Sequence, residues 1–390
     1  MAHDLQSIGY LWDGHHTKTW VPVLQDPNAP QPYPPKSDSW SKPETSLFIS
    51  IASFRDARCG RTLFNLLTKA AHPERLTIGV VQQGLKDDDD CLDSYCQSGG
   101  SETGAGQCKH SNRIRILRTD AEESAGPCWG RHLQSYLLDK DQEFCMQTDS
   151  HMDVVQDWDV YMMKEWAATS NEYGVLSTYC QDSRYLGVNV QGHYEVAHLC
   201  EFVIPANQVR NKQALALKQM TRPKLTTTWA AGYSFSKCHA ERTVPYDPYL
   251  PQIFDGEEFS RFVRLFTHGY DVYTPSRSYI THDYGKNNPH AQLVARNSAT
   301  SEVKASNKRL WNLLEMPGKG TKKEIKDIQS SPWGLGDKRS LDQLMEFSAI
   351  DLRKKEFTGP IGHRCGGIEW VPFKEEWPPM VDNIQYGPFW

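Results

Sequence analysis

Asp149 and His151, two residues apart, carry the clearest chemical signal in this sequence of 390 residues. They follow an apolar run that begins at Phe144 and is short enough to be a buried strand. Side chains two positions apart at a strand end project to the same side, so a carboxylate oxygen and an imidazole nitrogen would lie together. That donor pair suits manganese or a similar divalent ion. The structural alternative is that either residue caps a turn or a helix.

Two ligands do not complete a metal site, so a third ligand is expected from another segment. His282 is the best candidate, because it ends a second short extended segment, 278–281, with Tyr284 beside it. Diphosphate oxygens and water would complete the coordination, and the ion would neutralise charge on a departing nucleoside diphosphate.

Further charged candidates lie at two expected helix starts. Glu257 and Glu258 occupy the first turn of a segment whose phenylalanines recur at helical spacing. Acidic side chains there interact favourably with the helix dipole, which explains them without catalysis. Arg131 lies in the first turns of a helix expected over 126–139, where it and the helix N-terminus could bind a phosphate. Its plain alternative is a surface arginine.

A strand–helix–strand unit precedes these residues. Residues 47–51 and 76–81 read as strands, and 59–71 has leucines at helical spacing between them. The two strands are therefore expected to be parallel neighbours. Residues 113–118 read as a third strand, so the predicted class is α/β. In open α/β sheets ligands bind beyond the carboxyl ends of the strands, which is where Asp149 and His151 would lie.

The two ends of the chain differ in composition from its middle. Residues 1–45 are rich in Pro, Asp, Ser and Trp, which favours an extended N-terminal arm. We expect a catalytic core over 46–285 and a C-terminal extension over 286–390 packed on it. The extension contains a Lys-rich segment, 304–326, whose simplest interpretation is a solvated helix face.

Composition also excludes some functions. A formal net charge of -5 argues against nucleic acid as the main partner. No run of about 18 apolar residues occurs, so no membrane span is expected. The start of the chain lacks the features of a signal peptide, which favours the cytoplasm. The Golgi lumen is the alternative if an anchor has been removed from a longer parent. Walker, GxGxxG, GxSxG and HExxH motifs are absent, which weakens the corresponding classes.

The ten cysteines are ambiguous. Those scattered singly read as reduced core cysteines of a cytosolic protein. They are Cys59, Cys128, Cys145, Cys180, Cys200, Cys238 and Cys365. Cys91, Cys96 and Cys108 share a polar loop with His110. A zinc site there is less favoured than a loop disulfide or free thiols, because the spacing matches no standard finger.

Several segments, taken in order and spacing, resemble the polypeptide α-N-acetylglucosaminyltransferases. They are ISIASFRD, GVVQQ, GPCWGR, EFCMQTDSHM, AAGYSFS, VPYDPYLP, DGEE, RLFTHGYD and HDYG, which together cover roughly residues 46–285. That group includes the cytoplasmic enzyme that modifies hydroxyproline on a ubiquitin-ligase adaptor, and relatives that act on Thr of mucin-type proteins. The resemblance implies a GT-A glycosyltransferase fold, with a Rossmann-like mixed sheet flanked by helices.

The resemblance also implies a UDP-GlcNAc donor, a divalent metal that is Mn2+ or Mg2+, and retention of anomeric configuration. Asp149 and His151 match the metal motif, here DSH, and His282 matches the third ligand. Glu257 and Glu258 match the acidic pair beside the sugar, so these two and Asp149 are the expected catalytic residues. The donor is expected to contact Ser53, Phe54, Arg55, Gln83, Gly126, Arg131, Asp149 and Ser150. Gly130 stands where the family commonly has Ala.

The resemblance leaves mechanism and acceptor open. Same-face substitution is favoured, and double displacement with Glu257 or Glu258 as nucleophile is the alternative. The expected acceptor is a polypeptide hydroxyl of hydroxyproline, Thr or Ser. A different sugar donor, a glycan or a small-molecule acceptor are alternatives within the class. A non-catalytic sugar- or nucleotide-binding protein, and a metal-dependent hydrolase or nucleotidyltransferase, are alternatives from other classes. The oligomeric state is left open.

Overall fold

The computed structural model describes most of the chain. The described ranges are 5–14, 17–100, 108–187, 195–205, 208–212, 214–285, 301–317, 320–358 and 363–375. Eight of the described strands form one central mixed sheet, in the order β14-β16-β8-β15-β6-β3-β4-β5. In chain order they are β3 (Leu47–Phe54), β4 (Leu76–Gly84), β5 (Ile114–Asp120), β6 (Phe144–Asp149), β8 (Gly174–Ser177), β14 (Lys224–Leu225), β15 (Tyr233–Lys237) and β16 (Asp271–Thr274).

Strands β3, β4, β5 and β6 are mutually parallel, and β15 runs antiparallel to both of its neighbours. Parallel strands covered on both faces are built from continuous apolar runs, and Ile49, Ile51 and Ile78 are fully buried. The helix α1 (Cys59–Thr68) connects β3 to β4. The strand–helix–strand unit predicted from the sequence, with parallel strands, is confirmed.

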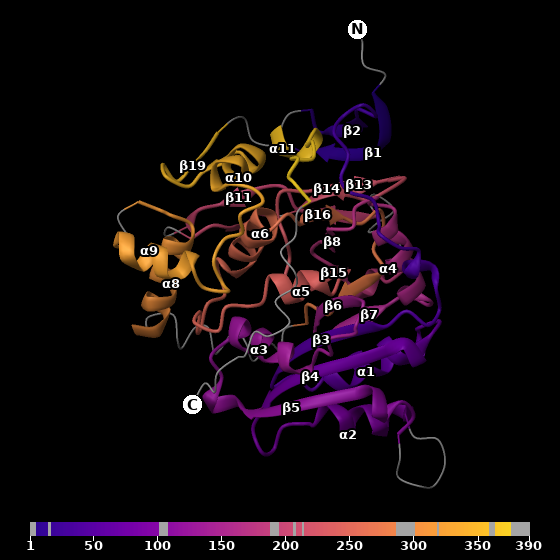
Figure 1. The fold of residues 1–390 in the computed structure, drawn as a ribbon. Helices are drawn as coiled ribbons and strands as arrows, with labels where there is room; N and C mark the ends of the chain where they lie inside the picture. The colour runs from indigo at the N-terminus through magenta and orange to yellow at the C-terminus, as the bar shows by residue number, and fades with distance from the viewer. Residues whose placement is uncertain are drawn as a thin grey trace.

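Helices cover the two faces of this sheet, so the core forms two main clusters (Figure 1). One cluster packs α1 and α4 (Trp158–Ala167) against the sheet. The other packs α6 (Glu257–Thr267) and nearby C-terminal residues against the opposite face. The helix α3 (Pro127–Gln134) is shorter than the predicted 126–139, because a 3-10 turn at Ser135–Leu137 ends it. Short helices α2 (Cys91–Tyr95) and α5 (His239–Thr243) complete the core.

A small three-stranded sheet, β7-β17-β9, lies at the carboxyl end of β6. Its strands are β7 (Met152–Val154), β9 (Gln181–Asp182) and β17 (Ile280–His282). The antiparallel pairing of β17 with β7 places His282 opposite Met152, the residue that follows His151. This pairing brings two segments about 130 residues apart in the chain together at one end of the main sheet.

The N-terminal residues differ from the predicted extended arm. Strands β1 (Gln6–Asp13) and β2 (Thr19–Gln25) form a hairpin that joins β13 (Leu215–Lys218) and β10 (Val196–His198) in a four-stranded sheet. Ile8 and Leu11 of β1 and Val23 of β2 are buried there, which stabilises the hairpin. Figure 1 shows this hairpin at the opposite end of the molecule from β5.

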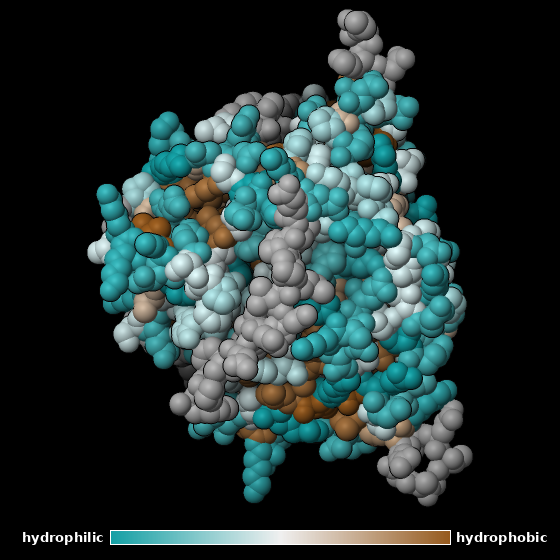
Figure 2. Space-filling model, in the orientation of Figure 1, coloured by the Kyte–Doolittle hydropathy of each residue, from teal (hydrophilic) through white to brown (hydrophobic). Residues whose placement is uncertain are grey.

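The described C-terminal residues contact the helix α6 and the strand β16 of the central sheet. Their elements are α8 (Ser301–Leu313), α9 (Lys322–Gln329), α10 (Leu341–Ser348), β18 (Ile350–Asp351), β19 (Glu356–Phe357) and α11 (His363–Gly366). Phe347 of α10 stacks on Phe266 of α6 with ring centroids 5.0 Å apart. Buried Arg339 pairs with Asp271 of β16 at 2.8 Å. The Lys-rich segment lies on α8 and α9. Figure 2 shows that the face of the molecule turned toward the viewer is largely hydrophilic. The division into an arm, a core and an extension stays a prediction.

The cysteines require a correction. The structure contains the disulfides Cys59–Cys91, Cys96–Cys108, Cys145–Cys238 and Cys200–Cys365. The prediction of reduced core cysteines was therefore wrong for Cys59, Cys145, Cys200, Cys238 and Cys365. Cys128 and Cys180 are buried free thiols, as predicted. Partners up to 165 residues apart meet only once the sheets assemble, so single cysteines give no pairing signal.

The polar loop contains one of these disulfides, Cys96–Cys108, while Cys91 pairs outside the loop. The loop thiols are therefore consumed as disulfides, and a zinc site built from them is excluded. Within the described ranges, no helix combines the length and apolar character needed to cross a membrane.

Candidate active site

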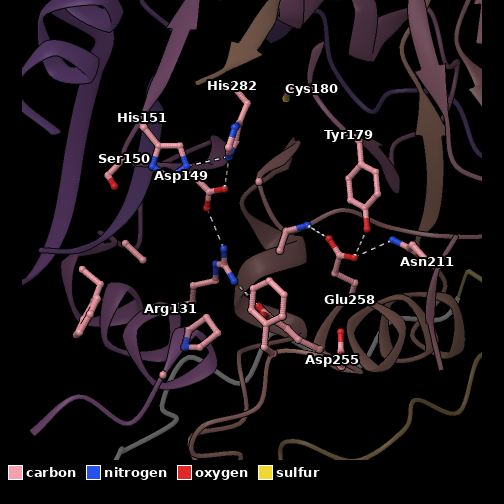
Figure 3. Close-up of a pocket in the computed structure, with 18 of the residues that line it drawn as sticks. Arg131, Asp149, Ser150, His151, Tyr179, Cys180, Asn211, Asp255, Glu258 and His282 are labelled. Atoms are coloured by element: carbon pink, nitrogen blue, oxygen red, sulfur yellow. Dashed lines mark hydrogen bonds and ion pairs between the residues drawn. The ribbon is translucent and has the colours of Figure 1, made fainter. Parts of the chain in front are cut away.

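A cavity of about 460 Å³ opens at the carboxyl ends of β3, β4 and β6 (Figure 3). Most of the residues singled out from the sequence line it. They are Phe54, Gln83, Gly126, Arg131, Asp149, Ser150, His151, Glu257, Glu258 and His282. Ser53 and Arg55 are not among its lining residues. Ser53 is buried between two neighbours that do line the cavity, and Arg55 pairs with Asp88 at 2.8 Å.

Asp149, His151 and His282 form a cluster whose ligand atoms all lie within 4.8 Å of one another. Nε2 of His151 lies 2.8 Å from Nε2 of His282, which in turn lies 3.7 Å from a carboxylate oxygen of Asp149. One oxygen and two imidazole nitrogens that converge on one point fit a divalent ion of the manganese type. The Nδ1 atom of His282 is buried without a hydrogen-bond partner among the described residues. Burial lowers the pKa of His282 to about 4, so this side chain is neutral and able to ligate a cation.

Asp56 lies directly behind His151. Its carboxylate accepts hydrogen bonds from Nδ1 of His151 at 2.6 Å and from the Ser150 hydroxyl at 2.8 Å. Burial acts to raise the pKa of Asp56, but hydrogen bonds from His151 and Arg58 hold it below the ordinary value. Arg55, just before it, adopts a left-handed φ of 48°. Few non-glycine residues do so, and here the turn directs Asp56 toward the cavity.

Arg131 is held between two carboxylates. Its guanidinium donates to Glu257 at 2.5 Å and to Asp149 at 3.0 Å, and only 8% of its surface is exposed. The surface arginine considered from the sequence is therefore excluded. Burial acts to raise the pKa of Asp149, but Arg131 and the two histidines hold it below the ordinary value. Burial outweighs Arg131 at Glu257, whose pKa is raised.

Glu258 forms the opposite wall of the cavity (Figure 3). Its carboxylate accepts from the Tyr179 hydroxyl at 2.7 Å, the Asn211 amide at 3.0 Å and the Ala231 backbone N–H at 3.0 Å. Burial raises the pKa of Glu258 to about 7, although these donors oppose the shift. The site thus combines an ionised carboxylate at the metal cluster with a carboxyl group that titrates near neutral pH.

Sequence reasoning missed several lining residues. Asp56 had a usable signal, because it follows the end of β3 as Asp149 ends β6, and the two strands are parallel neighbours. Tyr179 and Asn211 had none, since Tyr179 lies between β8 and β9, Asn211 ends the two-residue strand β12 (Arg210–Asn211), and only the fold brings them to Glu258. Phe254 and Tyr284, which are 53% and 55% exposed, also line the cavity. Exposed aromatic residues cannot be recognised from composition alone.

A mixed α/β sheet whose strand ends hold an Asp–His–His cluster beside two buried glutamates defines a protein with a candidate metal-dependent active site. The chain belongs to the glycosyltransferase (GlcNAc) family, whose model matches residues 46–109 and 94–354. Among curated proteins, no sequence matches the chain. The family agrees with the predicted GT-A class, although it does not test the narrower polypeptide α-N-acetylglucosaminyltransferase group.

Solved structures similar to this chain share little sequence with it. GalNAc-T7 with UDP, GalNAc and Mn2+ has a TM-score of 0.48 at 13% identity, covering 84% of this chain and 58% of that one. The Pyrobaculum calidifontis mannosyltransferase PcManGT with GDP-Man and Mn2+ has a TM-score of 0.40 at 12% identity, covering 69% and 64%. S. aureus TarS 1-349 with UDP-GlcNAc has a TM-score of 0.39 at 12% identity, covering 68% and 70%. The chain thus spans less than two thirds of the first two proteins.

Proposed function

We propose that this protein is a metal-dependent, retaining glycosyltransferase that moves GlcNAc from UDP-GlcNAc to a hydroxyl group of a polypeptide. The observation that carries the proposal is the convergence of Asp149, His151 and His282 in one cavity with two buried glutamates. Membership of the glycosyltransferase (GlcNAc) family supports the reaction class. The cavity volume of about 460 Å³ falls in the range of small-molecule sites.

The donor is proposed to extend across the cavity in a defined direction. Phe54, Gln83 and Gly126 line the side formed by β3, β4 and the start of α3, where the nucleoside would bind. Asp149 and the two histidines lie in the middle, where the diphosphate would share the cation. Glu258 and Asn211 line the far side, where polar groups suit sugar hydroxyls.

The bound cation would act as a Lewis acid that neutralises charge on the departing diphosphate. The residues of the chain do the rest. Arg131 keeps the Asp149 carboxylate ionised and oriented, since it donates to one oxygen and leaves the other facing His282. Glu258 accepts three hydrogen bonds, which occupy lone pairs that a nucleophile would need. This arrangement favours same-face substitution, with Glu258 orienting the sugar, over double displacement through Glu258.

The acceptor is proposed to be hydroxyproline, Thr or Ser of a polypeptide in an oxidising compartment. Four disulfides support that compartment, because cytosolic proteins rarely keep such bonds. Of the two locations considered from the sequence, the Golgi lumen therefore fits better than the cytoplasm. Exposed Phe254 and Tyr284 at the cavity offer apolar contact to a polypeptide chain.

The test is a donor panel assayed with Mn2+, with Mg2+ and with a chelator. We expect UDP release from UDP-GlcNAc that requires Mn2+ and increases with a Thr-containing peptide. Asp149→Ala and His151→Ala should abolish this release, while His72→Ala, a histidine outside the cavity, should leave it unchanged. Robust turnover by a well-folded His151→Ala variant would refute the assignment. Release of pyrophosphate from nucleoside triphosphates would instead indicate a nucleotidyltransferase.

A further inference from the structure

A closed ring of contacts joins the two segments that carry the candidate histidine ligands. We propose that Asp56 and Arg58, in the turn between β3 and α1, are positioning residues that set the affinity of the site for its divalent cation. This inference rests on the proposed function only for the existence of the metal site. Neither Asp56 nor Arg58 was assigned a role from the sequence.

The first half of the ring fixes His151. A carboxylate oxygen accepts hydrogen bonds, so in the 2.6 Å contact with Asp56 the Nδ1–H of His151 is the donor. The lone pair of Nε2 then points at the cluster, which is the form that a metal requires. The side chain of Asp56 is only 7% exposed, so water competes little for this contact.

The second half of the ring connects His151 to the His282 segment. Arg58 donates from Nε to Asp56 at 2.9 Å and from a terminal nitrogen to the Asp283 carbonyl at 3.0 Å. The backbone N–H of Asp283 in turn donates to the His151 carbonyl at 2.9 Å. Strands β7 and β17 pair over three residues only, so the side chains of this ring add substantially to what holds the two segments in register.

The two histidines depend on the ring in different ways. His151 has a carboxylate on its second nitrogen, whereas Nδ1 of His282 is buried without a hydrogen-bond partner among the described residues. Apart from the contacts of its Nε2 with His151 and Asp149, the orientation of His282 therefore depends on packing and on the position of its segment, which Arg58 holds through Asp283. Loss of Asp56 should disturb the His151 ligand itself. Loss of Arg58 should loosen the distance between the two histidines.

The test measures cation binding to the whole protein, independently of sugar transfer. The free Mn2+ signal in electron paramagnetic resonance gives the dissociation constant, with and without UDP. Asp56→Ala should weaken binding about 10- to 100-fold, as is usual when a metal-bound histidine loses its outer partner. Asp56→Asn should weaken it less, because the amide oxygen still accepts from Nδ1. Arg58→Gln should lie between the parent and Asp56→Ala.

Arg61→Gln is the matched control, because Arg61 is an exposed arginine in the first turn of the adjoining helix α1, and its ion pair with Asp153 is 3.9 Å long. Its Mn2+ affinity should equal that of the parent. Parent-like affinity of folded Asp56→Ala, or equal losses for Asp56→Ala and Asp56→Asn, would overturn the inference. If Asp56→Ala does not fold, Asp56→Asn and Arg58→Gln decide the question, and parent-like affinity of both overturns it.

The same measurements separate this inference from the proposed function. Absence of saturable Mn2+ binding by the parent protein would overturn both. Normal Mn2+ binding with the expected ranking of variants, but no transfer from any nucleotide-sugar, would support the positioning role and refute the glycosyltransferase proposal.

Discussion

Removing Arg131 should destabilise the protein in a way that depends strongly on pH. Its guanidinium is buried between Asp149 and Glu257, which it contacts at 3.0 and 2.5 Å. Arg131→Met keeps most of the side-chain volume but leaves the buried Glu257 and the half-buried Asp149 without their shared cation. Breaking a buried ion pair by deleting one partner costs about 3–5 kcal/mol. We expect a loss of that size in the free energy of unfolding at pH 7.

The pH dependence follows from the pKa of Glu257. Burial already raises this pKa, and Arg131 is the main cause that opposes the rise, so the variant raises it further. A carboxyl group with a raised pKa in the folded state favours folding when it is protonated. Stability is therefore retained below the unfolded pKa of about 4.3, and it falls by up to about 1.4 kcal/mol per pH unit as the pH rises toward the folded pKa. The destabilisation should be much smaller at pH 4.5 than at pH 7.

The assay is urea unfolding at both pH values, followed by far-UV circular dichroism. At pH 7 the double variant Arg131→Met/Glu257→Gln should be more stable than Arg131→Met by more than about 1 kcal/mol, because it no longer contains the unpaired carboxylate of Glu257. Arg55→Met is the matched control, since its partner Asp88 lies at the surface and exposed pairs contribute about 0–1 kcal/mol. A loss below about 1 kcal/mol for Arg131→Met at pH 7, or no recovery in the double variant, would refute the reasoning.

Other substitutions test separate parts of the structure. Glu258→Gln should become more stable relative to the parent protein as the pH rises from 5 to 8, by on the order of 1 kcal/mol. The reason is that burial raises the pKa of Glu258 to about 7, so the parent protein loses stability as this glutamate ionises. Thermal unfolding at several pH values measures this difference. Replacing Cys145 and Cys238 by Ala should lower the free energy of unfolding by about 4 kcal/mol, since their bond closes a loop with a sequence separation of 93. Parent protein that unfolds in the same way with and without a reductant would contradict this expectation. Gly232→Ala should weaken Mn2+ binding about tenfold, because the added Cβ would lie 2.9 Å from a carboxylate oxygen of Asp149. Unchanged affinity by calorimetry would count against that placement of Asp149.

Much of the cavity could be predicted because its residues sit where regular elements begin or end. Asp149 ends an apolar strand, and Glu257 and Glu258 open a helix with an unmistakable apolar face. Local patterns of this kind give the position of a side chain along an element and the side to which it points. They do not give its partners, so Arg131 could be placed on its helix but not between two carboxylates.

The unpredicted features all depend on contacts between distant segments. The N-terminal hairpin pairs with β13, some 200 residues later, and its Pro-rich continuation obscured the strands. The partners of the three disulfides that were not predicted are likewise separated by 32 to 165 residues. Asp56 belonged to a recognised motif, but its contact with His151 requires the register between β3 and β6. Pairing information of this type is absent from the periodicity of a single sequence.

The electrostatics of the cavity support a division of labour between its two walls. Burial acts to raise the pKa values of Asp56 and Asp149, but cationic and hydrogen-bonding partners hold them below the ordinary value, so both carboxylates at the metal cluster stay ionised across the physiological range. Glu258 has a raised pKa because burial outweighs its neutral donors, so this carboxyl group gains and loses its charge near neutral pH. When their environments separate the pKa values of two carboxyl groups, the two groups can play different chemical roles in one site. Ionised carboxylates attract the cation, and a protonated Glu258 suits an uncharged sugar. Raising the pH from 6 to 8 should therefore charge Glu258 while the Asp149 carboxylate stays ionised, so we expect the KM for the donor to change over this range through Glu258.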